Sequence, residues 1–199
     1  MQEDETQLTD SLVDEDLRAA HEQRQERDEL AAAKSSAKTH SEAAHERNQS
    51  LSVDLPIDAL REEILQAVRA ERVTILVGAT GCGKSTRLPQ FWMDEPGAKV
   101  LVTQPRRVAA VEIARRVSSE RGERIGQNVG YRISGETVRG SGKLQFATIG
   151  YVLTWFLAKP EHFGSFTHVV IDEVHERAAD MEMFLLLTKL LMYFFKGPK

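Results

Sequence analysis

The stretch "VTILVGATGCGKST", residues 73–86, joins an apolar run to a glycine-rich loop that ends in a lysine and two hydroxyl side chains. The loop matches the pattern G-x-x-x-x-G-K-[ST], with Gly78, Gly83, Lys84 and Ser85 at its fixed positions. Glycines let the backbone wrap a phosphate with no Cβ in the way, so that successive N–H groups point inward at a helix N-terminus. The stretch therefore predicts a strand, a phosphate-binding loop and a helix, in that order.

The side chains of this loop indicate its ligand. Lys84 is placed to neutralise the β- and γ-phosphates of ATP, and the hydroxyl of Ser85 is placed to ligate Mg²⁺. Cys82 occupies a free position of the pattern, and we interpret it as a small loop residue rather than a redox switch. The predicted nucleotide-binding residues are Gly78, Ala79, Thr80, Gly81, Cys82, Gly83, Lys84, Ser85 and Thr86.

A second segment, "HVVIDEVHER" at residues 168–177, supplies the carboxylates that ATP hydrolysis needs. Asp172 and Glu173 follow four residues suited to a buried strand. We expect Asp172 to hold Mg²⁺ directly or through water, and Glu173 to polarise the attacking water. Two acids after a strand also fit a solvated strand end, but their occurrence together with the phosphate loop favours catalysis by Lys84, Asp172 and Glu173.

Apolar strands alternate with helical patterns from Leu51 onward. This alternation predicts an α/β fold with a mainly parallel sheet covered by helices on both faces. Helices are expected at 56–71, 83–95, 106–122, 151–159 and 181–195, and strands at 72–78, 99–105, 129–134, 143–150 and 167–173.

The net charge of −4 over 199 residues conceals two different segments. Residues 1–50 hold 13 Asp and Glu against 6 Lys and Arg, a net −7, whereas residues 51–199 hold 17 against 20, a net +3. The first segment has no aromatic residue and few apolar ones, so we predict an acidic tail, disordered or transiently helical. A solubilising role is favoured over a partner-binding helix. Residues 51–199 form the predicted domain.

Composition also bears on the compartment. The single cysteine excludes an internal disulfide framework and a cysteine-cluster zinc site. The acidic start "MQEDETQLTD" resembles neither a signal peptide nor a mitochondrial transit peptide. The apolar run at 181–195 is interrupted by Glu182 and Lys189 and is shorter than the roughly 20 residues that a bilayer requires. We expect an intracellular protein of nucleus or cytoplasm, with a buried helix there and no membrane contact.

Three motifs in order resemble those of the DEAH/RHA-type DExH-box RNA helicases of superfamily 2. "GATGCGKST" resembles motif I of that family, "TQPRRVAA" motif Ia and "DEVHER" motif II, and the resemblance covers roughly residues 55–199. It implies the N-terminal RecA-like ATP-binding domain of an ATP-dependent RNA helicase, with a P-loop NTPase fold. Other P-loop ATPases lack these two later motifs in this order.

The resemblance also implies roles for single residues. His175 would couple the γ-phosphate site to a second RecA-like domain as part of the catalytic set, and Arg116 would stack on adenine. Residues 103–143 carry nine Lys and Arg against four Glu, which suits contacts with RNA phosphates that carry little sequence preference. The positions that match the family's RNA path are Thr103, Gln104, Arg106, Arg107 and Thr148.

The resemblance predicts that the domain is incomplete at its C-terminal end. By this resemblance, we expect the motif III strand and a second RecA-like domain to come from downstream sequence that is missing after Lys199. In RecA-like sheets that strand separates the two that end in the phosphate loop and in motif II, so we expect a gap or a nonstandard neighbour between 73–77 and 168–172. We expect the isolated chain to be inactive or very weak. The alternative is a truncated module that binds nucleotide or RNA without turnover.

Overall fold

The structure is a computed structural model that describes Gln25, Asp28 and residues 55–195. The chain divides into two units, Met1–Glu46 and Arg47–Lys199. Gln25 and Asp28 are helical. The remainder of the expected acidic tail lies outside the described residues, so its character and its boundary at residue 50 stay predictions. The elements described below all belong to the second unit.

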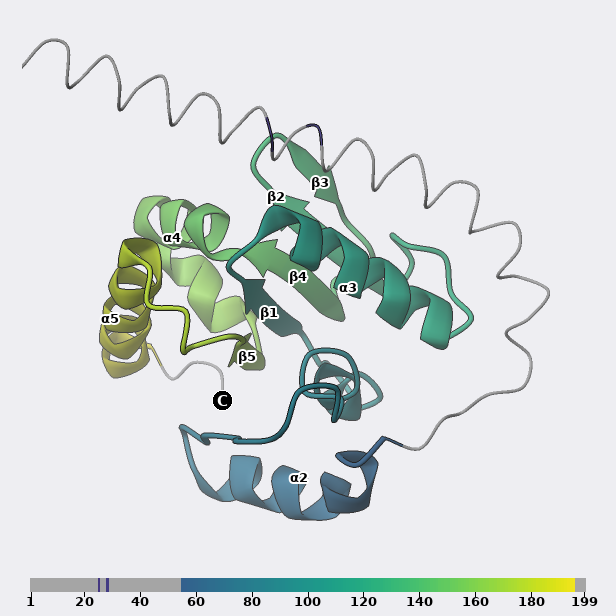
Figure 1. Cartoon of the computed structure of the whole chain (residues 1–199). Helices are drawn as coiled ribbons and strands as arrows, with labels where there is room; N and C mark the ends of the chain where they lie inside the picture. The colour runs from purple at the N-terminus through teal and green to yellow at the C-terminus, as the bar shows by residue number, and fades with distance from the viewer. Residues whose placement is uncertain (1–24, 26–27, 29–54, 196–199) are drawn as a thin grey trace, which may run out of the picture. The chain divides into compact units, whose positions relative to one another are not determined.

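A five-stranded sheet in the order β3-β2-β4-β1-β5 forms the centre of this unit (Figure 1). The central strand pairs are parallel: β1 pairs with β4 and β5, and β2 pairs with β4. Only β3 runs antiparallel, as a hairpin on β2. The expected mainly parallel sheet is confirmed. The strands are β1 (Val100–Gln104), β2 (Val129–Ile133), β3 (Glu136–Val138), β4 (Leu144–Thr148) and β5 (His168–Ile171).

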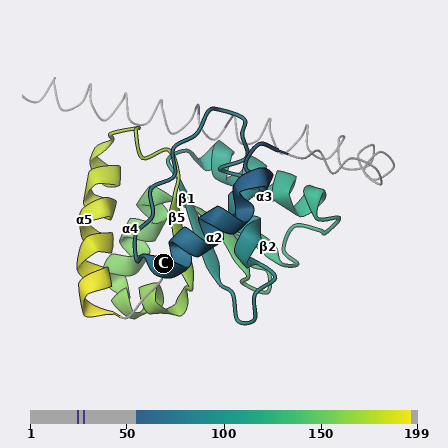
Figure 2. The ribbon, with the colours of Figure 1, turned by 90° about the horizontal axis from the view of Figure 1, so that it is seen from below.

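Helices cover both faces of the sheet, as the alternation predicts. In Figure 2, α3 lies on one side of the strands, and α4 and α5 lie on the other. All four predicted amphipathic or apolar helices outside the phosphate-loop region form close to their expected bounds. They are α2 (Arg61–Ala70), α3 (Arg107–Glu120), α4 (Ile149–Ala158) and α5 (Ala179–Phe194), with short 3₁₀ turns η1 (Asp58–Leu60), η2 (Leu88–Trp92) and η3 (Pro160–Ser165).

The core is aromatic on the α4 and α5 side of the sheet. Phe156 of α4, Phe163 of η3 and Phe184 of α5 are fully buried. The ring of Phe156 stands edge-on to Phe163 with centroids 5.6 Å apart and stacks on Phe184 at 6.4 Å. On β2, burial and a hydrogen bond to Glu136 raise the pKa of Tyr131 to about 12. All five residues of β1 are buried, which fits a central strand covered on both faces.

Two expected elements around the phosphate loop are wrong. The strand predicted at 72–78 does not form: residues 73–79 have no regular secondary structure, and Ile75 and Val77 are 86% and 90% exposed. The predicted helix at 83–95 is replaced by turns and the 3₁₀ turn η2. In Figure 1 the chain between α2 and β1 accordingly runs as loops and turns rather than as a further arrow.

The sheet ends at β5, which pairs with β1 alone among the described strands. Residues 73–77 make no backbone hydrogen bond to any other described residue. A strand depends on hydrogen bonds from a neighbouring strand, so an apolar β-prone segment without such a neighbour stays irregular. The expected gap between 73–77 and the strand that leads to Asp172 is therefore present.

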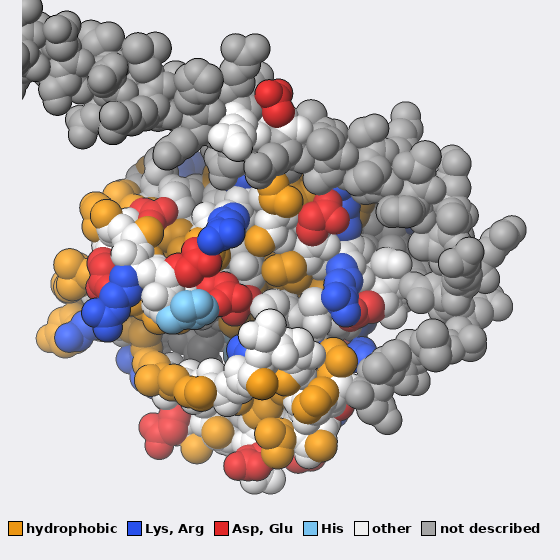
Figure 3. Space-filling view, viewed as in Figure 1, with side chains coloured by type: hydrophobic (Ala, Val, Ile, Leu, Met, Phe, Trp, Pro, Cys, Tyr) orange, Lys and Arg blue, Asp and Glu red, His pale blue; other side chains and the backbone are white. Residues whose placement is uncertain are grey.

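Helix α5 exposes an apolar surface. Its buried residues include Met181 and Phe184, which face the core. The opposite side carries Met183, Leu186, Leu190, Tyr193 and Phe194, all exposed. Figure 3 shows hydrophobic side chains gathered at the position of this helix. Among the described residues, no helix has both the length and the apolar character for crossing a bilayer.

Candidate nucleotide-binding site

The glycines of the phosphate loop hold conformations that other residues adopt with strain. Gly81 has φ +80° and Gly83 has φ +106°. A Cβ added at Gly83 would lie 2.7 Å from Cγ2 of Ile57 and 3.0 Å from Cδ1 of Leu55. The second fixed glycine of the motif is therefore required both by its backbone angle and by the segment that packs against the loop.

Lys84 folds back over its own loop. Its Nζ donates hydrogen bonds to the carbonyl oxygens of Gly78 at 2.6 Å and Ala79 at 2.8 Å, and lies 3.8 Å from Sγ of Cys82. A Cβ added at Gly78 would approach Cδ and Nζ of this lysine within 4.0 Å. These are ordinary van der Waals distances, whereas the same Cβ would lie at a tighter 3.1 Å from Sγ of Cys82. The ammonium group of Lys84 is exchangeable because it is bound to carbonyl oxygens rather than to a carboxylate.

The motif II carboxylates are tied to the end of β1. Because β1 and β5 are parallel neighbours, their carboxyl ends meet at one edge of the sheet. There Nε2 of Gln104 donates to Oδ2 of Asp172 at 2.6 Å, and Oδ1 of Asp172 accepts from the backbone N–H of Glu173 at 3.0 Å. Glu173 has φ +53°, the only positive value at a described residue other than glycine. Asp172 is thereby held in a defined orientation.

A second contact joins the segment that follows β1 to motif II. Nη2 of Arg106 lies 3.2 Å from Oε1 of Glu176. The neighbouring Arg107 donates instead to the backbone oxygen of Ser134, at 3.0 Å. Between the two links, Nδ1 of His175 lies 3.3 Å from Oε2 of Glu173. Motifs Ia and II therefore form one connected polar network.

Three of the residues expected on the RNA path are buried in this structure. They are Thr103, Gln104 and Thr148, which are 0%, 2% and 7% exposed. Sequence reasoning missed the role of Gln104, which orients Asp172; its position at the end of a strand parallel to β5 is the signal for it. Arg116, expected against adenine, pairs with Glu120 one turn along α3 at 3.0 Å.

The phosphate loop and motif II are not connected in this structure. Within the described part of the chain, no hydrogen bond or ion pair joins residues 78–86 to residues 172–177. The irregular course of residues 73–79 accounts for this, because a strand in the sheet would fix the loop at the same edge as Asp172. Each half of the expected site is present as a separate local arrangement.

The residues of both halves suit Mg²⁺ chemically. Asp172 and Ser85 offer hard oxygen ligands, which this ion prefers. Each Asp172 oxygen accepts one hydrogen bond and keeps lone-pair capacity for a further contact. No cluster of three or more His, Cys, Asp or Glu able to hold a metal occurs among the described residues, so any such ion would depend on ligands from elsewhere, such as phosphates.

We expect Gln104→Leu to reduce the free energy of unfolding by about 1–3 kcal/mol, because Asp172 loses its short hydrogen bond in a half-buried setting. Urea denaturation followed by circular dichroism measures the effect. Combined with Asp172→Asn in a double-mutant cycle, the two changes should be non-additive. Strict additivity would show that the 2.6 Å contact does not couple the two residues.

A glycine-rich phosphate loop, a mainly parallel sheet and paired carboxylates at a strand end define a P-loop NTPase domain of the RecA-like type. The sequence profile of the DEAD/DEAH box helicases matches residues 59–191, and the chain belongs to that family. The crystal structure of the Escherichia coli DEAH/RHA helicase HrpB matches with a TM-score of 0.66 at 32% identity, over 70% of this chain and 18% of that one.

Curated relatives carry helicase names. The putative ATP-dependent RNA helicase DHX57 of Homo sapiens is 41% identical over 143 residues, which are 68% of this chain and 10% of that protein. The Arabidopsis thaliana DExH-box ATP-dependent RNA helicase DExH1 is 38% identical over 146 residues, 69% of this chain and 15% of the relative. The chain thus spans only a small part of the proteins it matches.

Proposed function

We propose that this chain is the ATP-binding domain of an ATP-dependent RNA helicase. Residues 78–86 bind the phosphates, and Asp172, Glu173 and His175 act on them from the end of β5. The observation that carries the proposal is the oriented Asp172, held by Gln104 and by the N–H of Glu173 at the carboxyl edge of the sheet. Family membership over residues 59–191 supports it.

Nucleotide binding requires Lys84 to exchange its partners. Its ammonium moves from the carbonyl oxygens of Gly78 and Ala79 to phosphate oxygens, which are stronger acceptors because they are charged. Asp172 and Ser85 are the residues that would hold Mg²⁺, which supplies charge neutralisation at the phosphates when bound. Glu173 would accept a proton from the attacking water. Adenine contact by Arg116 would require release of Glu120.

RNA contact rests on the arginines at the start of α3. Arg106 is 74% exposed, whereas Arg107 is tied to Ser134. Arg106 lies at the carboxyl edge of β1, next to Glu176 of motif II. A phosphate that displaces Glu176 from Arg106 would therefore also disturb the segment that carries Glu173 and His175. This connection supports a coupling between RNA and the nucleotide site.

A module that binds nucleotide without turnover is the second candidate. It is favoured by the irregular course of residues 73–79 and by the lack of contact between the two halves of the site in the described residues. Only the helicase proposal includes RNA unwinding and a second RecA-like domain. Both candidates require Mg-ATP binding, and they differ in chemistry after binding.

Phosphate release from Mg-ATP, measured with and without single-stranded RNA, separates the two candidates. RNA-stimulated release that Glu173→Gln removes would support the helicase domain, because this change keeps the shape of the side chain and deletes its basicity. ATP binding without release by the 199-residue chain would favour the binding module. Absence of ATP binding would contradict both.

Arg106→Ala should weaken binding of single-stranded RNA about three- to tenfold at low salt and lower the salt slope by about one, because one phosphate contact is lost. Fluorescence anisotropy with a labelled oligonucleotide measures both quantities. Lys189→Ala on α5 is the matched control, since this exposed lysine lies far from the motif in the sequence. Equal effects of the two changes would contradict a specific role for Arg106.

A further inference from the structure

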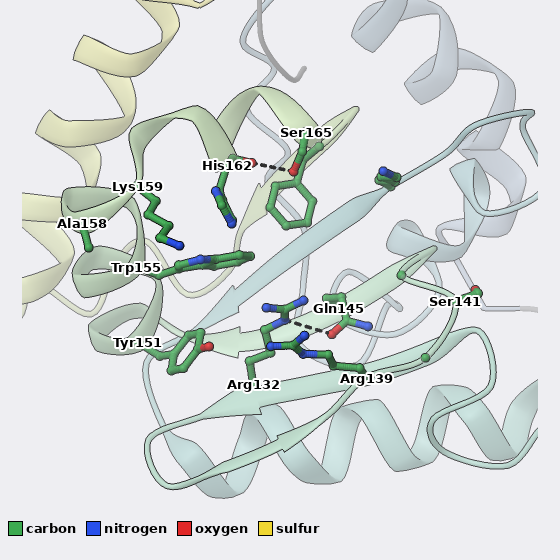
Figure 4. A pocket seen from close by; sticks show the side chains of 14 residues that line it. Arg132, Arg139, Ser141, Gln145, Tyr151, Trp155, Ala158, Lys159, His162 and Ser165 are labelled. Atoms are coloured by element: carbon green, nitrogen blue, oxygen red, sulfur yellow. Dashed lines mark hydrogen bonds between the residues drawn. The ribbon is translucent and has the colours of Figure 1, made fainter.

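A cavity of about 570 Å³ opens on the α4 side of the sheet, away from the proposed nucleotide site (Figure 4). Its walls come from segments that precede strands: Lys99 before β1, Ser141 before β4, and Phe166 before β5. In a parallel sheet the amino ends of the strands lie at the edge opposite their carboxyl ends. The cavity is therefore separate from Asp172, and its volume falls within the range of about 300–1,000 Å³ typical of ligand sites.

The cavity is strongly basic. Lys99, Arg132, Arg139 and Lys159 line it, and no Asp or Glu stands among its lining residues. In the described part of the chain, the side chains of Lys99, Arg139 and Lys159 form no hydrogen bond or ion pair. These four cations repel one another because no carboxylate in the cavity wall neutralises them. An anionic ligand would relieve this repulsion and would therefore be bound favourably.

Aromatic groups lie beside these cations. The Arg132 guanidinium lies 4.5 Å from the centre of the Trp155 ring, and the His162 ring stands edge-on to that ring at 5.0 Å. Tyr151, one turn before Trp155 on α4, also lines the cavity. Figure 4 shows Trp155, His162 and Arg132 directed toward one space. In single-stranded nucleic-acid sites, nucleobases stack on aromatic rings and on the planes of arginine guanidinium groups.

One side chain in the wall of this cavity has a polar atom without a hydrogen-bond partner. Gln145 of β4 is 2% exposed, and its Oε1 accepts a long hydrogen bond of 3.4 Å from Nε of Arg132. Its buried Nε2 has no hydrogen-bond partner. Buried donors without partners are costly in a native protein, and such a group in a cavity wall points to a ligand or water that accepts from it.

We propose that this cavity is a second site, which binds one nucleotide unit through its phosphate and its base. Arg139 and Lys159, both exposed at the rim, hold the phosphate, and the base lies beside Arg132 and Trp155. The unit is either a free mononucleotide or one nucleotide of single-stranded RNA. This site is independent of Lys84 and goes beyond the proposed ATP-binding function.

Trp155 provides a direct signal for this binding. The chain has two tryptophans, and the other, Trp92, is buried against the ring of His168. We expect UMP or a U₁₂ RNA to quench the fluorescence of the full chain carrying Lys84→Ala, and Trp155→Phe to remove the quenching. Saturation by UMP identifies a free nucleotide as the ligand, and saturation by U₁₂ alone identifies an RNA strand; either supports the proposal.

Charge reversal at the rim tests the cations. Arg139→Glu with Lys159→Glu should weaken the binding at least about tenfold, because charge-assisted contacts with phosphate become repulsive. Lys143→Glu with Lys189→Glu is the matched control, since it changes the net charge equally at exposed lysines that do not line the cavity. If the circular dichroism spectrum of the variant with both glutamates differs from that of the parent, the double variant Arg139→Ala with Lys159→Ala is used in its place.

Three results would overturn the proposal. The first is the absence of Trp155-dependent quenching with both UMP and U₁₂. The second is equal weakening by the rim pair and by the control pair, which would show only general electrostatic attraction. The third is equal quenching by a peptide of twelve glutamates, which would show that the cavity selects negative charge without a nucleobase. Because all measurements use Lys84→Ala, they are independent of ATP binding at the phosphate loop.

Discussion

Replacing Lys84 with alanine should abolish most Mg-ATP binding by this chain. Lys84 is the only lysine or arginine of the loop at 78–86. A charge-assisted hydrogen bond to phosphate contributes about 1.5–3 kcal/mol, so its loss corresponds to a roughly 10- to 100-fold weaker Kd. Titration with a fluorescent ATP analogue in the presence of Mg²⁺ measures this change.

The conformation of Lys84 makes a folding control necessary. Its ammonium binds the carbonyl oxygens of Gly78 and Ala79, so the alanine variant also loses two contacts within the loop. A thermal melt of the variant distinguishes loss of the loop from loss of phosphate contact. Lys143→Ala, a change at another exposed lysine, should leave the ATP affinity unchanged. An unaltered affinity of Lys84→Ala would remove the basis for the assignment of this loop.

The loop illustrates what residue spacing can predict. Glycine and lysine positions follow from the chemistry of phosphate binding, and the positive φ of Gly83, which glycine adopts without strain, agrees with that requirement. The position of the lysine head group does not follow from spacing. In this structure its acceptors are two carbonyl oxygens of its own loop, those of Gly78 and Ala79. Such a choice depends on which partners are present and not on the motif.

The segment 73–77 shows that a strand-like sequence is not sufficient for a strand to form. Its β-branched and apolar residues have a high β propensity, and the same composition correctly predicts β1 and β5. β1 has parallel neighbours on both sides, whereas 73–77 has no neighbour among the described strands. Strand formation depends on pairing with a neighbouring strand, so a segment with a strand-like sequence and no such neighbour does not form a strand.

The hairpin of β2 and β3 was within reach of sequence reasoning. Ser134 and Gly135 alone separate the two strands, and Gly135 has φ +78°. Two residues that include glycine between strand-like segments indicate a tight hairpin. The three-residue β3 is too short to show alternation, so the sequence pattern does not predict it. The basic cavity, by contrast, unites residues from positions 99 to 166, and only the topology of the sheet reveals it.

Phe156→Ala should lower the free energy of unfolding by about 3–5 kcal/mol, the usual cost of a large cavity in a well-packed core. Phe156 is fully buried between α4, η3 and α5, where its ring contacts Phe163 and Phe184.

The matched control is Phe194→Ala, the same substitution at a residue that is 74% exposed, with an expected effect within about 0.5 kcal/mol. Urea denaturation of both variants measures the difference. Since Phe194 belongs to the exposed apolar side of α5, its replacement should also reduce self-association in light scattering. Equal destabilisation by the two changes would show that α4 and α5 do not form the packed layer described above.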